Sequence, residues 1–237
     1  MNLPPVAILC GGMGTRLYPL TEQRPKALVE ILGEPFLDHQ LRLLKDSGIE
    51  RVVLCAGHHS QSLCEYAGDG SRFGVTVEYS FDGPVLLGTA GAVKRALPRL
   101  GDEFFVLYGD SYLPCNYRAV AKSFRVAGKQ GLMTVFQNEG NWDTSNVEVS
   151  DRGEILAYDK KNLTPRMRHI DYGLGIFRAS AFDRVPPETV FDLAHLYQQL
   201  LADGQLSASM ISERFYEVGS FKGIRELETF LSRKAAL

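Results

Sequence analysis

The chain has 237 residues, of which 45% are hydrophobic and 23% charged, as expected for a globular protein with one packed core. Its formal net charge is −2, so no overall positive field attracts nucleic acid, and any anionic ligand must be held by a local cluster of cations. No apolar run is long enough to span a bilayer, and residues 1–5 lack the pattern of a signal peptide.

The four cysteines are scattered along the chain and form no CxxC pair; they are Cys10, Cys55, Cys64 and Cys115. The five histidines are no better grouped, so the spacing does not suggest a zinc site. Reduced thiols and the lack of an export signal favour a cytoplasmic protein. We expect neither a nucleic-acid nor a membrane partner, and self-association into a homo-oligomer stays open.

Short apolar runs alternate with amphipathic patterns through the first half of the chain. Strands are predicted at residues 6–10, 51–56, 75–79, 103–108 and 132–136. Helices are predicted at residues 35–47, 89–97 and 117–127. Such alternation favours an α/β fold, with a Rossmann-like three-layer α/β/α arrangement and a mostly parallel mixed sheet.

The pattern becomes less regular after about residue 145. A hairpin is predicted from residues 146–149 and 154–158 around the turn at 150–153. A strand at 172–177 and helices at 190–202 and 221–231 follow. No repeat or flexible linker separates these segments from the first half, so residues 1–237 are expected to form a single domain.

Three glycines, Gly11, Gly12 and Gly14, follow the first predicted strand. A glycine loop lets backbone N–H groups converge on phosphate oxygens, although glycines after a strand are also common turn residues. A Walker loop would need Gly-Lys, which is absent. A dinucleotide fingerprint would need its last glycine at position 17, which is Leu17, so a nicotinamide-dependent reductase is not supported.

Two cations follow the glycines, Arg16 at the end of the loop and Lys26 ten residues later. A triphosphate needs cations on different oxygens, and a guanidinium fork with a point charge meets that need. Pro19 and Pro25 stiffen the intervening segment. Taken alone, an isolated arginine or lysine is usually a solvated surface charge.

Taken whole, residues 11–21 with Pro25 and Lys26 resemble the sugar-1-phosphate nucleotidyltransferase family, whose fold is GT-A-like. The resemblance implies an NTP and a sugar 1-phosphate as substrates, with residues 1–140 as the nucleotide-binding half and 141–237 as the sugar-phosphate-binding half. It assigns Arg16 to the departing pyrophosphate and Lys26 to the phosphates, as catalytic residues. The nucleotide-binding positions that it implies are Leu9, Gly11, Gly12, Gly14, Thr15, Gly88 and Thr89.

Some of these positions also have a plain structural interpretation. Thr89 could simply cap the helix that starts there, which is compatible with a nucleotide lying on the same backbone. Asp110 follows the strand at 103–108, where a lone aspartate more often belongs to a turn or a helix cap.

The resemblance also implies a Mg²⁺ cofactor, held by Asp110 and Glu217. In the family the second metal ligand is usually an aspartate in an Asp-x-Gly-Thr string, whereas this chain has Glu217-Val218-Gly219-Ser220. A glutamate supplies the same hard oxygen ligand, but its carboxylate lies farther from the backbone by one methylene. An exposed glutamate at a strand end would explain the residue as well.

The sugar-phosphate side is assigned more weakly by the same resemblance. Asp159 and Lys160 match an acid–lysine pair that contacts sugar hydroxyls and the 1-phosphate, although Lys161 stands where many relatives have proline. The remaining sugar-phosphate positions that it implies are Asn146, Tyr172 and Gly173. A hairpin turn and a core strand would account for the same residues without a sugar.

The base and the sugar are not fixed by these motifs. The short chain is similar in style to heptose 1-phosphate guanylyltransferases and to N-acetylmuramate 1-phosphate uridylyltransferases. We lean to GTP with a heptose or hexose 1-phosphate, with uridylyl transfer to an amino-sugar 1-phosphate as the alternative. A non-catalytic regulatory subunit is disfavoured, because such a subunit has no chemical need for Arg16, Lys26, Asp110 and an acid at position 217 together.

Overall fold

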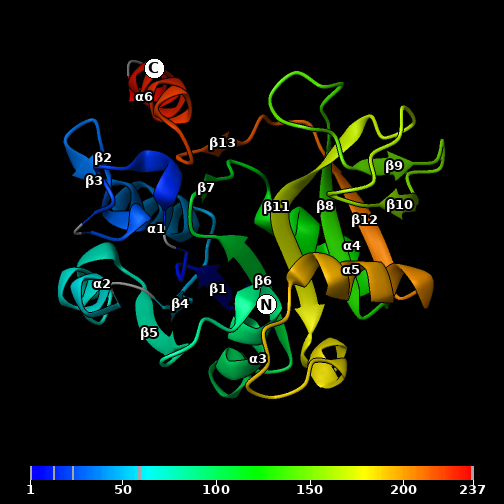
Figure 1. Ribbon diagram of the computed structural model, residues 1–237, viewed down its shortest axis with the longest axis horizontal. Helices are drawn as coiled ribbons and strands as arrows, with labels where there is room; N and C mark the ends of the chain where they lie inside the picture. Colours follow the sequence, from blue (N-terminus) through cyan, green and yellow to red (C-terminus); the bar gives the residue numbers. More distant parts are fainter. Residues whose placement is uncertain (1, 13, 23, 58–59, 236–237) are drawn as a thin grey trace.

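A mixed β-sheet forms the centre of the protein in a computed structural model that describes residues 2–12, 14–22, 24–57 and 60–235 (Figure 1). Within these residues the sheet has nine strands, which follow the order β10-β9-β11-β6-β1-β4-β5, and β8 and β12 extend it from β11. The strands are β1 (Val6–Leu9), β4 (Arg51–Ala56), β5 (Thr76–Phe81), β6 (Glu103–Tyr108), β8 (Gly131–Gln137), β9 (Val147–Val149), β10 (Ile155–Tyr158), β11 (His169–Arg178) and β12 (Leu206–Ile211).

The half of the sheet that contains β1 is parallel. β1 pairs in parallel with both β4 and β6, and β4 pairs in parallel with β5. Val6, Ala7 and Ile8 are fully buried, because helices cover both faces of this part of the sheet. The carboxyl ends of β1, β4 and β6 therefore meet along one edge, where open α/β sheets bind their ligands.

The other half of the sheet is mostly antiparallel. β11 runs antiparallel to both β6 and β8, and its register with β8 shifts between Asp171 and Gly175. β12 pairs in parallel with the far side of β8, and β9 with β10 forms an antiparallel hairpin. The irregularity in β11 lies next to the carboxyl end of β6, in the position where bulges often redirect side chains toward a site.

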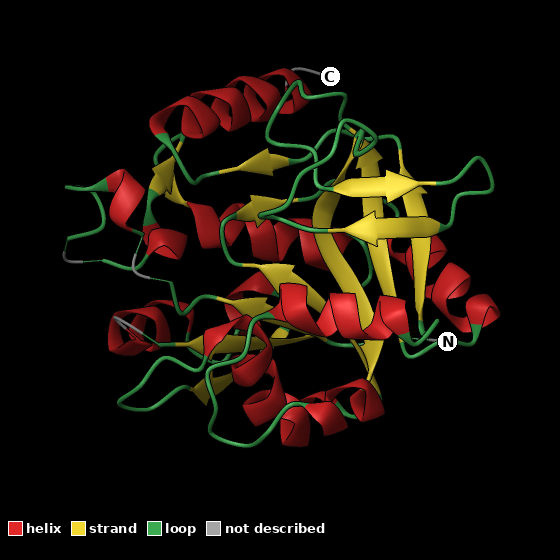
Figure 2. Cartoon of the chain, turned by 45° about the vertical axis from the view of Figure 1, so that its right-hand side comes forward, coloured by secondary structure: helices red, strands yellow, loops and turns green. Residues whose placement is uncertain are grey.

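Helices cover both faces of the sheet (Figure 2). The helices are α1 (Phe36–Asp46), α2 (Ser60–Ala67), α3 (Gly88–Leu100), α4 (Tyr117–Ala127), α5 (Leu193–Ala202) and α6 (Phe221–Ala235). Polar caps fix some of the ends: Asn116 accepts a hydrogen bond from the N–H of Ala119 at the start of α4, and Gly128 ends that helix in the left-handed conformation.

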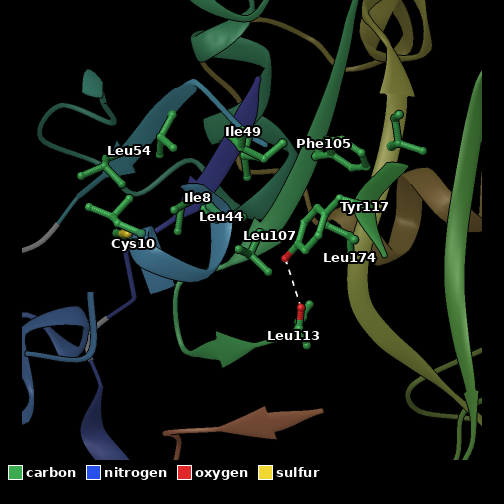
Figure 3. Packing of buried hydrophobic residues seen from close by; sticks show 14 of the residues in the cluster. Ile8, Cys10, Leu44, Ile49, Leu54, Phe105, Leu107, Leu113, Tyr117 and Leu174 are labelled. Atoms are coloured by element: carbon green, nitrogen blue, oxygen red, sulfur yellow. Dashed lines mark hydrogen bonds between the residues drawn. The ribbon is translucent and has the colours of Figure 1, made fainter. Parts of the chain in front are cut away.

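Two apolar clusters lie on opposite faces of the sheet. One joins strand residues such as Ile8, Leu54 and Phe105 to α1, α2 and α4 through Leu44 and Tyr117 (Figure 3). The other lies under α3 and α5 and surrounds its own set of aromatic side chains, Phe104, Phe177, Phe182 and Tyr197. The two clusters make the three-layer α/β/α arrangement that the strand–helix alternation predicts.

A third apolar cluster ties the end of the chain to its beginning. Val218, Ile224 and Leu227 pack against Leu17 and Ile31. Two small ribbons frame this contact, β2 (Glu30–Ile31) with β3 (Glu34–Pro35), and β7 (Ser111–Tyr112) with β13 (Tyr216–Glu217). The C-terminal segment thus packs against residues near the start of the chain.

The predicted elements agree closely with the structure in the first half of the chain. The strands at 51–56 and 103–108 and the helix at 117–127 have the predicted bounds, and the predicted hairpin is present as β9 and β10. The predicted helix at 190–202 begins at Leu193, where Asp192 caps it. Helix α2 and strand β12 are absent from the predictions. No helix in the described ranges combines the length and apolar character needed to cross a membrane.

Candidate functional site

A cavity of about 280 Å³ opens at the carboxyl ends of β1, β4 and β6. Most of the residues predicted to bind the nucleotide line it, together with Lys26 and Asp110. They are Leu9, Gly11, Gly12, Gly14, Gly88 and Thr89. The volume suits the base of a nucleotide, and the glycines in the lining leave their backbone N–H groups open to phosphate. Thr15 and Arg16 are exposed and do not line this cavity.

The glycine loop leaves its backbone open toward the cavity. A Cβ atom at Gly12 would meet nothing within 4 Å, so this peptide is accessible to a ligand. Gly14 has a φ of 63° and holds the loop in shape, since Thr21 donates a 2.9 Å hydrogen bond to its carbonyl. The short helix that follows, at Thr15–Leu17, is anchored by the fully buried Leu17. This anchor fixes the backbone that carries Arg16, whose guanidinium lies near Gly219.

The start of α3 forms the opposite wall of the cavity. Gly88 has a φ of 70° and lies against the backbone of Phe191, which leaves no room for a side chain. Thr89 does not cap α3, as Leu87 precedes the helix. Its hydroxyl instead accepts a 2.6 Å hydrogen bond from the N–H of Leu193 and contacts Asp192, so it links α3 to α5 while lining the cavity.

Four charged side chains from distant parts of the sequence gather beside the cavity. Lys26 Nζ lies 2.6 Å from Asp110 Oδ2, and both side chains are mostly buried. Asp110 is tied to β13, because its carbonyl accepts a 2.8 Å hydrogen bond from the N–H of Val218. Glu217, the preceding residue, is paired with Ser111 of β7, so it lies next to Asp110, which directly precedes that strand.

Gly219 allows the two cations to approach this pair of acids. A Cβ atom at Gly219 would lie 3.0 Å from Arg16 Nη2 and 3.6 Å from Lys26 Nζ. A side chain there would crowd the guanidinium of Arg16, whereas its contact with Lys26 would be an ordinary one. Gly219 has no role among the residues predicted from the sequence, although the string Glu217-Val218-Gly219-Ser220 contains it. Gly109 is a second omission: a Cβ atom there would lie 2.5 Å from the carbonyl oxygen of Leu9.

The carboxyl of Glu217 is strongly perturbed. Burial, together with the charges of Asp110 and Asp143, raises its pKa to about 7, against the opposing effect of Lys26 and Arg16. A divalent cation bound between two carboxylates would relieve their mutual repulsion, and carboxylate oxygens are the ligands that Mg²⁺ prefers. Among the described residues no group of three or more acidic, histidine or cysteine side chains offers a fuller cage.

Cys10 lines the cavity, but it is not placed to act as a nucleophile. Its side chain is buried, and burial followed by the charge of Asp110 raises the pKa of the thiol to about 12. A thiol with so high a pKa stays protonated near neutral pH and does not attack. All four cysteines are free, as expected for reduced thiols.

The predicted lysine of the sugar-phosphate side lies close to the cavity. Lys160 Nζ is 3.5 Å from the hydroxyl of Tyr108 and 5.2 Å from the centroid of its ring, and Tyr108 lines the cavity. Gly173, with a φ of 98°, faces the same corner: a Cβ atom there would lie 3.6 Å from both Tyr108 Cδ2 and Ser111 Oγ. Lys160 and Gly173 are therefore brought together by the fold beside Tyr108, which lines the same cavity as Asp110.

Asn146 and Asp159 are occupied by local hydrogen bonds. The Asn146 side chain accepts from the N–H of Asp171 at 2.9 Å, and its carbonyl accepts from the N–H of Asp159. The carboxylate of Asp159 accepts from the backbone N–H groups of Lys161 and Asn162 and from the Asn162 side chain. These bonds lower the pKa of Asp159 and shape the turn that presents Lys160.

The side chain of Tyr172 points away from the site. It is 2% exposed and packs with Phe136 and Phe215, with ring centroids 6.4 and 6.0 Å from its own. Alternation along β11 explains this: Ile170, Tyr172 and Leu174 face the cluster under α4, while Asp171 faces the opposite side. The structure thus gives the Tyr172 ring a place in the core and leaves only its backbone near the site.

Asp171 is a buried acid that the sequence analysis does not single out. Its side chain is 4% exposed, accepts hydrogen bonds from the hydroxyl of Tyr158 and the N–H of Gly173, and lies 3.9 Å from Lys160 Nζ. Burial raises its pKa, against the opposing effect of these three groups. The native state therefore keeps the proton to higher pH than the unfolded chain does.

This burial predicts a pH-dependent cost to stability. The ionisation of Asp171 should lower the free energy of unfolding of the wild type by about 1.4 kcal/mol per pH unit. This loss applies between the ordinary pKa of a carboxyl and the raised pKa of Asp171, and the free energy then levels off. Asp171→Asn should remove that loss, because an amide does not ionise, while its oxygen can still accept from the N–H of Gly173. Urea unfolding of both proteins across this pH range would show the difference. Identical pH profiles would contradict the prediction.

Asp159→Asn provides a control of opposite sign. Because the pKa of Asp159 is lowered in the native state, its contribution to stability is present above the unfolded pKa and lost as pH falls through the folded one.

Together these features define the class of the protein: an α/β fold with a ligand cavity at the carboxyl ends of parallel strands. The family model for nucleotidyl transferases matches residues 6–234, and the chain belongs to this family.

Its similarity to individual relatives is moderate. The chain is 29% identical to a UTP–glucose-1-phosphate uridylyltransferase of Synechocystis over 83% of its own length and 55% of that protein. It is 30% identical to the catalytic subunit beta of a mannose-1-phosphate guanylyltransferase of Dictyostelium discoideum, over 91% and 61% of the two chains. The chain thus spans less than two thirds of these two relatives.

Comparisons over nearly full lengths exist as well. An N-acetylmuramate alpha-1-phosphate uridylyltransferase of Neisseria meningitidis is 26% identical over 93% of this chain and 95% of that one. Among solved structures, a putative glucose-1-phosphate thymidylyltransferase from Bacillus anthracis superposes with a TM-score of 0.84, covering 95% and 94% of the chains at 20% identity. HddC from Yersinia pseudotuberculosis, solved with GMP-PN, gives a TM-score of 0.80 over 97% and 100%, also at 20% identity. These likenesses confirm the fold.

Proposed function

We propose that the chain is an enzyme that joins the NMP unit of an NTP to a sugar 1-phosphate and releases pyrophosphate. The convergence of Arg16, Lys26, Asp110 and Glu217 beside one nucleotide-sized cavity carries this proposal. Three separate segments supply these residues. A protein that only binds a nucleotide sugar has no need for two acids and two cations at one point.

The transfer needs no general base. The second pKa of a phosphate monoester is about 6, so the sugar 1-phosphate is largely dianionic at neutral pH and its oxygen can attack directly. A new bond forms between this oxygen and the α-phosphorus, while the bond from the α-phosphorus to the bridging oxygen of pyrophosphate breaks. The electron pair leaves with pyrophosphate. The high thiol pKa of Cys10 agrees with direct transfer that forms no enzyme-bound intermediate.

The residues of the site would act by position and charge. Lys26 would neutralise phosphate oxygens at the cavity, and Arg16 would bind the departing pyrophosphate from the rim. Lys160, beside Tyr108, would hold the phosphate of the sugar substrate. Asp110 and Glu217 would hold a Mg²⁺ ion, which supplies neutralisation of the charge that develops on the phosphates. When nucleotide binds, Lys26 would exchange its contact with Asp110 for one with phosphate.

The base and the sugar remain the finer part of the proposal. We favour GTP with a heptose or hexose 1-phosphate, and uridylyl transfer to an N-acetylmuramate-like amino-sugar 1-phosphate is the alternative. The names of the relatives include uridylyl, guanylyl and thymidylyl transferases, so they support the reaction class without favouring one base. A non-catalytic regulatory subunit that binds a nucleotide sugar is the other candidate.

A nucleotide panel tests these proposals directly. Each NTP is added with Mg²⁺ in a thermal-shift assay, and the NTP that binds is then screened with sugar 1-phosphates for pyrophosphate release. A true substrate at 100 times its Kd should stabilise the protein by about 2.7 kcal/mol. Stabilisation without pyrophosphate from any sugar 1-phosphate would favour the regulatory subunit. No shift with any NTP would contradict nucleotide binding itself.

A further inference from the structure

The loop at residues 138–146, which joins β8 to β9, reaches over the segment that leads into β13 (Figures 1 and 2). The two segments are joined by Arg214. Its guanidinium carbon lies 3.5 Å from the ring centroid of Trp142 in the loop and 4.7 Å from that of Tyr216 in β13. A planar guanidinium between two aromatic rings is a favourable and directional contact.

The contact continues into α6. Tyr216 stacks on Phe230, with ring centroids 4.5 Å apart and planes 27° apart. Arg214 also forms an ion pair with Glu226 of the same helix, and only a quarter of its side chain is exposed. We call Trp142, Arg214, Tyr216 and Phe230 the stacked column. It fixes the loop to β13 and α6 at once.

One buried side chain holds the loop together. The side chain of Asn138 donates to the carbonyl of Asp143 and to the hydroxyl of Ser145, and accepts from the N–H of Trp142. Asn138 is fully buried, so these bonds are shielded from water. Holding Trp142 therefore also holds the end of the loop, which leads into Asn146 and the strands beside Lys160.

The column meets the site at two places, the proposed metal-binding acid and the sugar-phosphate side. Tyr216 directly precedes Glu217, and the loop leads to the corner that contains Lys160 and Gly173. No member of the column lines the nucleotide cavity. Displacing the column would therefore change the metal-binding acid and the sugar-phosphate side while leaving the glycine loop in place.

We propose that Arg214 is a positioning residue that sets the distance between the loop at 138–146 and Glu217, and so aligns the sugar 1-phosphate with the metal-binding acid. The inference rests on the proposed function, since it assigns those two elements their ligands. It adds a determinant that lies outside the glycine loop and the charged cluster. Arg214 touches neither the nucleotide cavity nor the reacting groups, and acts through Trp142 and Tyr216.

The chain offers a matched control. Arg72 is also held between two rings, with its guanidinium carbon 4.1 Å from the centroid of Tyr66 and 4.4 Å from that of Phe73. None of these three residues lines the cavity. Arg72→Ala removes the same kind of contact as Arg214→Ala, but away from the site.

Steady-state kinetics provide the first readout. Arg214→Ala should raise the KM for the sugar 1-phosphate and the Mg²⁺ concentration needed for half-maximal rate by about 10- to 100-fold, as expected when reacting groups are misplaced. The KM for the NTP should stay at its wild-type value. Arg214→Lys keeps the charge but loses the planar guanidinium, so it should show the same raised KM and Mg²⁺ requirement. Trp142→Phe keeps an aromatic ring at this position and should stay close to wild type in both. Arg214→Ala kinetics equal to those of Arg72→Ala would overturn the proposal.

Fluorescence provides a second readout that does not depend on turnover. Trp142 is the only tryptophan of the chain, so its emission reports on the loop alone. Titration with MgCl₂ should change the emission of the wild type and of Arg72→Ala, but not of Arg214→Ala, whose Trp142 should also be more accessible to acrylamide. An unchanged wild-type signal would refute the coupling. A wild type that gives this signal but forms no pyrophosphate with any substrate pair would refute the proposed function alone.

Discussion

Asp110→Asn is expected to lower the rate of pyrophosphate release by on the order of 10³-fold or more, the range seen when preorganised charge stabilisation is lost. The substitution keeps the size of the side chain but removes the charge that faces Lys26 at 2.6 Å and the carboxylate proposed to hold Mg²⁺. Nucleotide affinity should change far less, because much of the cavity wall is glycine and backbone. A pyrophosphate-release assay with saturating NTP measures the effect.

Glu103→Gln is the matched control for this variant. Glu103 begins strand β6, which ends just before Asp110, and its mostly buried carboxylate forms a 2.7 Å ion pair with Arg125 outside the cavity lining. Its rate should stay within a few-fold of wild type. Equal losses in both variants would indicate a general disturbance of the fold, and full activity of Asp110→Asn would remove Asp110 from the proposed machinery.

The sequence predicts elements well where the local signal is complete. Strands β4 and β6 are continuous apolar runs, and α4 has an apolar stripe with Asn116 and Gly128 at its ends. Strand β12 has no such signal, because it is an edge strand with mostly half-exposed side chains, and α2 buries only Leu63 and Ala67. Such elements are stabilised by tertiary contacts that a sequence pattern does not contain.

The residues of the candidate site likewise divide into those that a sequence motif predicts and those that depend on tertiary contacts. Arg16, Lys26 and Asp110 belong to short strings with fixed spacing, and the fold brings them together with Glu217. The approach of Glu217 depends on a two-residue ribbon and on the packing of α6 against the start of the chain. The stacked column around Arg214 joins residues more than 70 positions apart and matches no motif. Side-chain direction is equally hard to predict: the same strand turns Tyr172 into the core and Asp171 toward Lys160.

Lys26→Met is the second substitution with a large expected effect. It keeps the length of the side chain and its apolar stem but removes the ammonium group. Pyrophosphate release should fall by about 10²- to 10³-fold, because a preorganised positive charge at the phosphates is lost. The loss should fall on kcat more than on the KM for the sugar 1-phosphate, since Lys160 rather than Lys26 lies on the sugar side.

Removing Lys26 also leaves the acids of the site without their nearest cation. Lys26 opposes the rise in the pKa of Glu217, so its loss should raise that pKa further and leave the negative charge of Asp110 without its partner at 2.6 Å. Added Mg²⁺ should therefore stabilise Lys26→Met against thermal unfolding more than it stabilises wild type. Lys94→Met is the control, since Lys94 is partly buried and donates a 2.9 Å hydrogen bond to the carbonyl of Phe182, outside the cavity lining. Equal losses of pyrophosphate release in Lys94→Met and Lys26→Met would show that the loss does not come from a missing charge at the phosphates. A loss confined to Lys26→Met would show that Lys26 supplies the cation that the transfer requires.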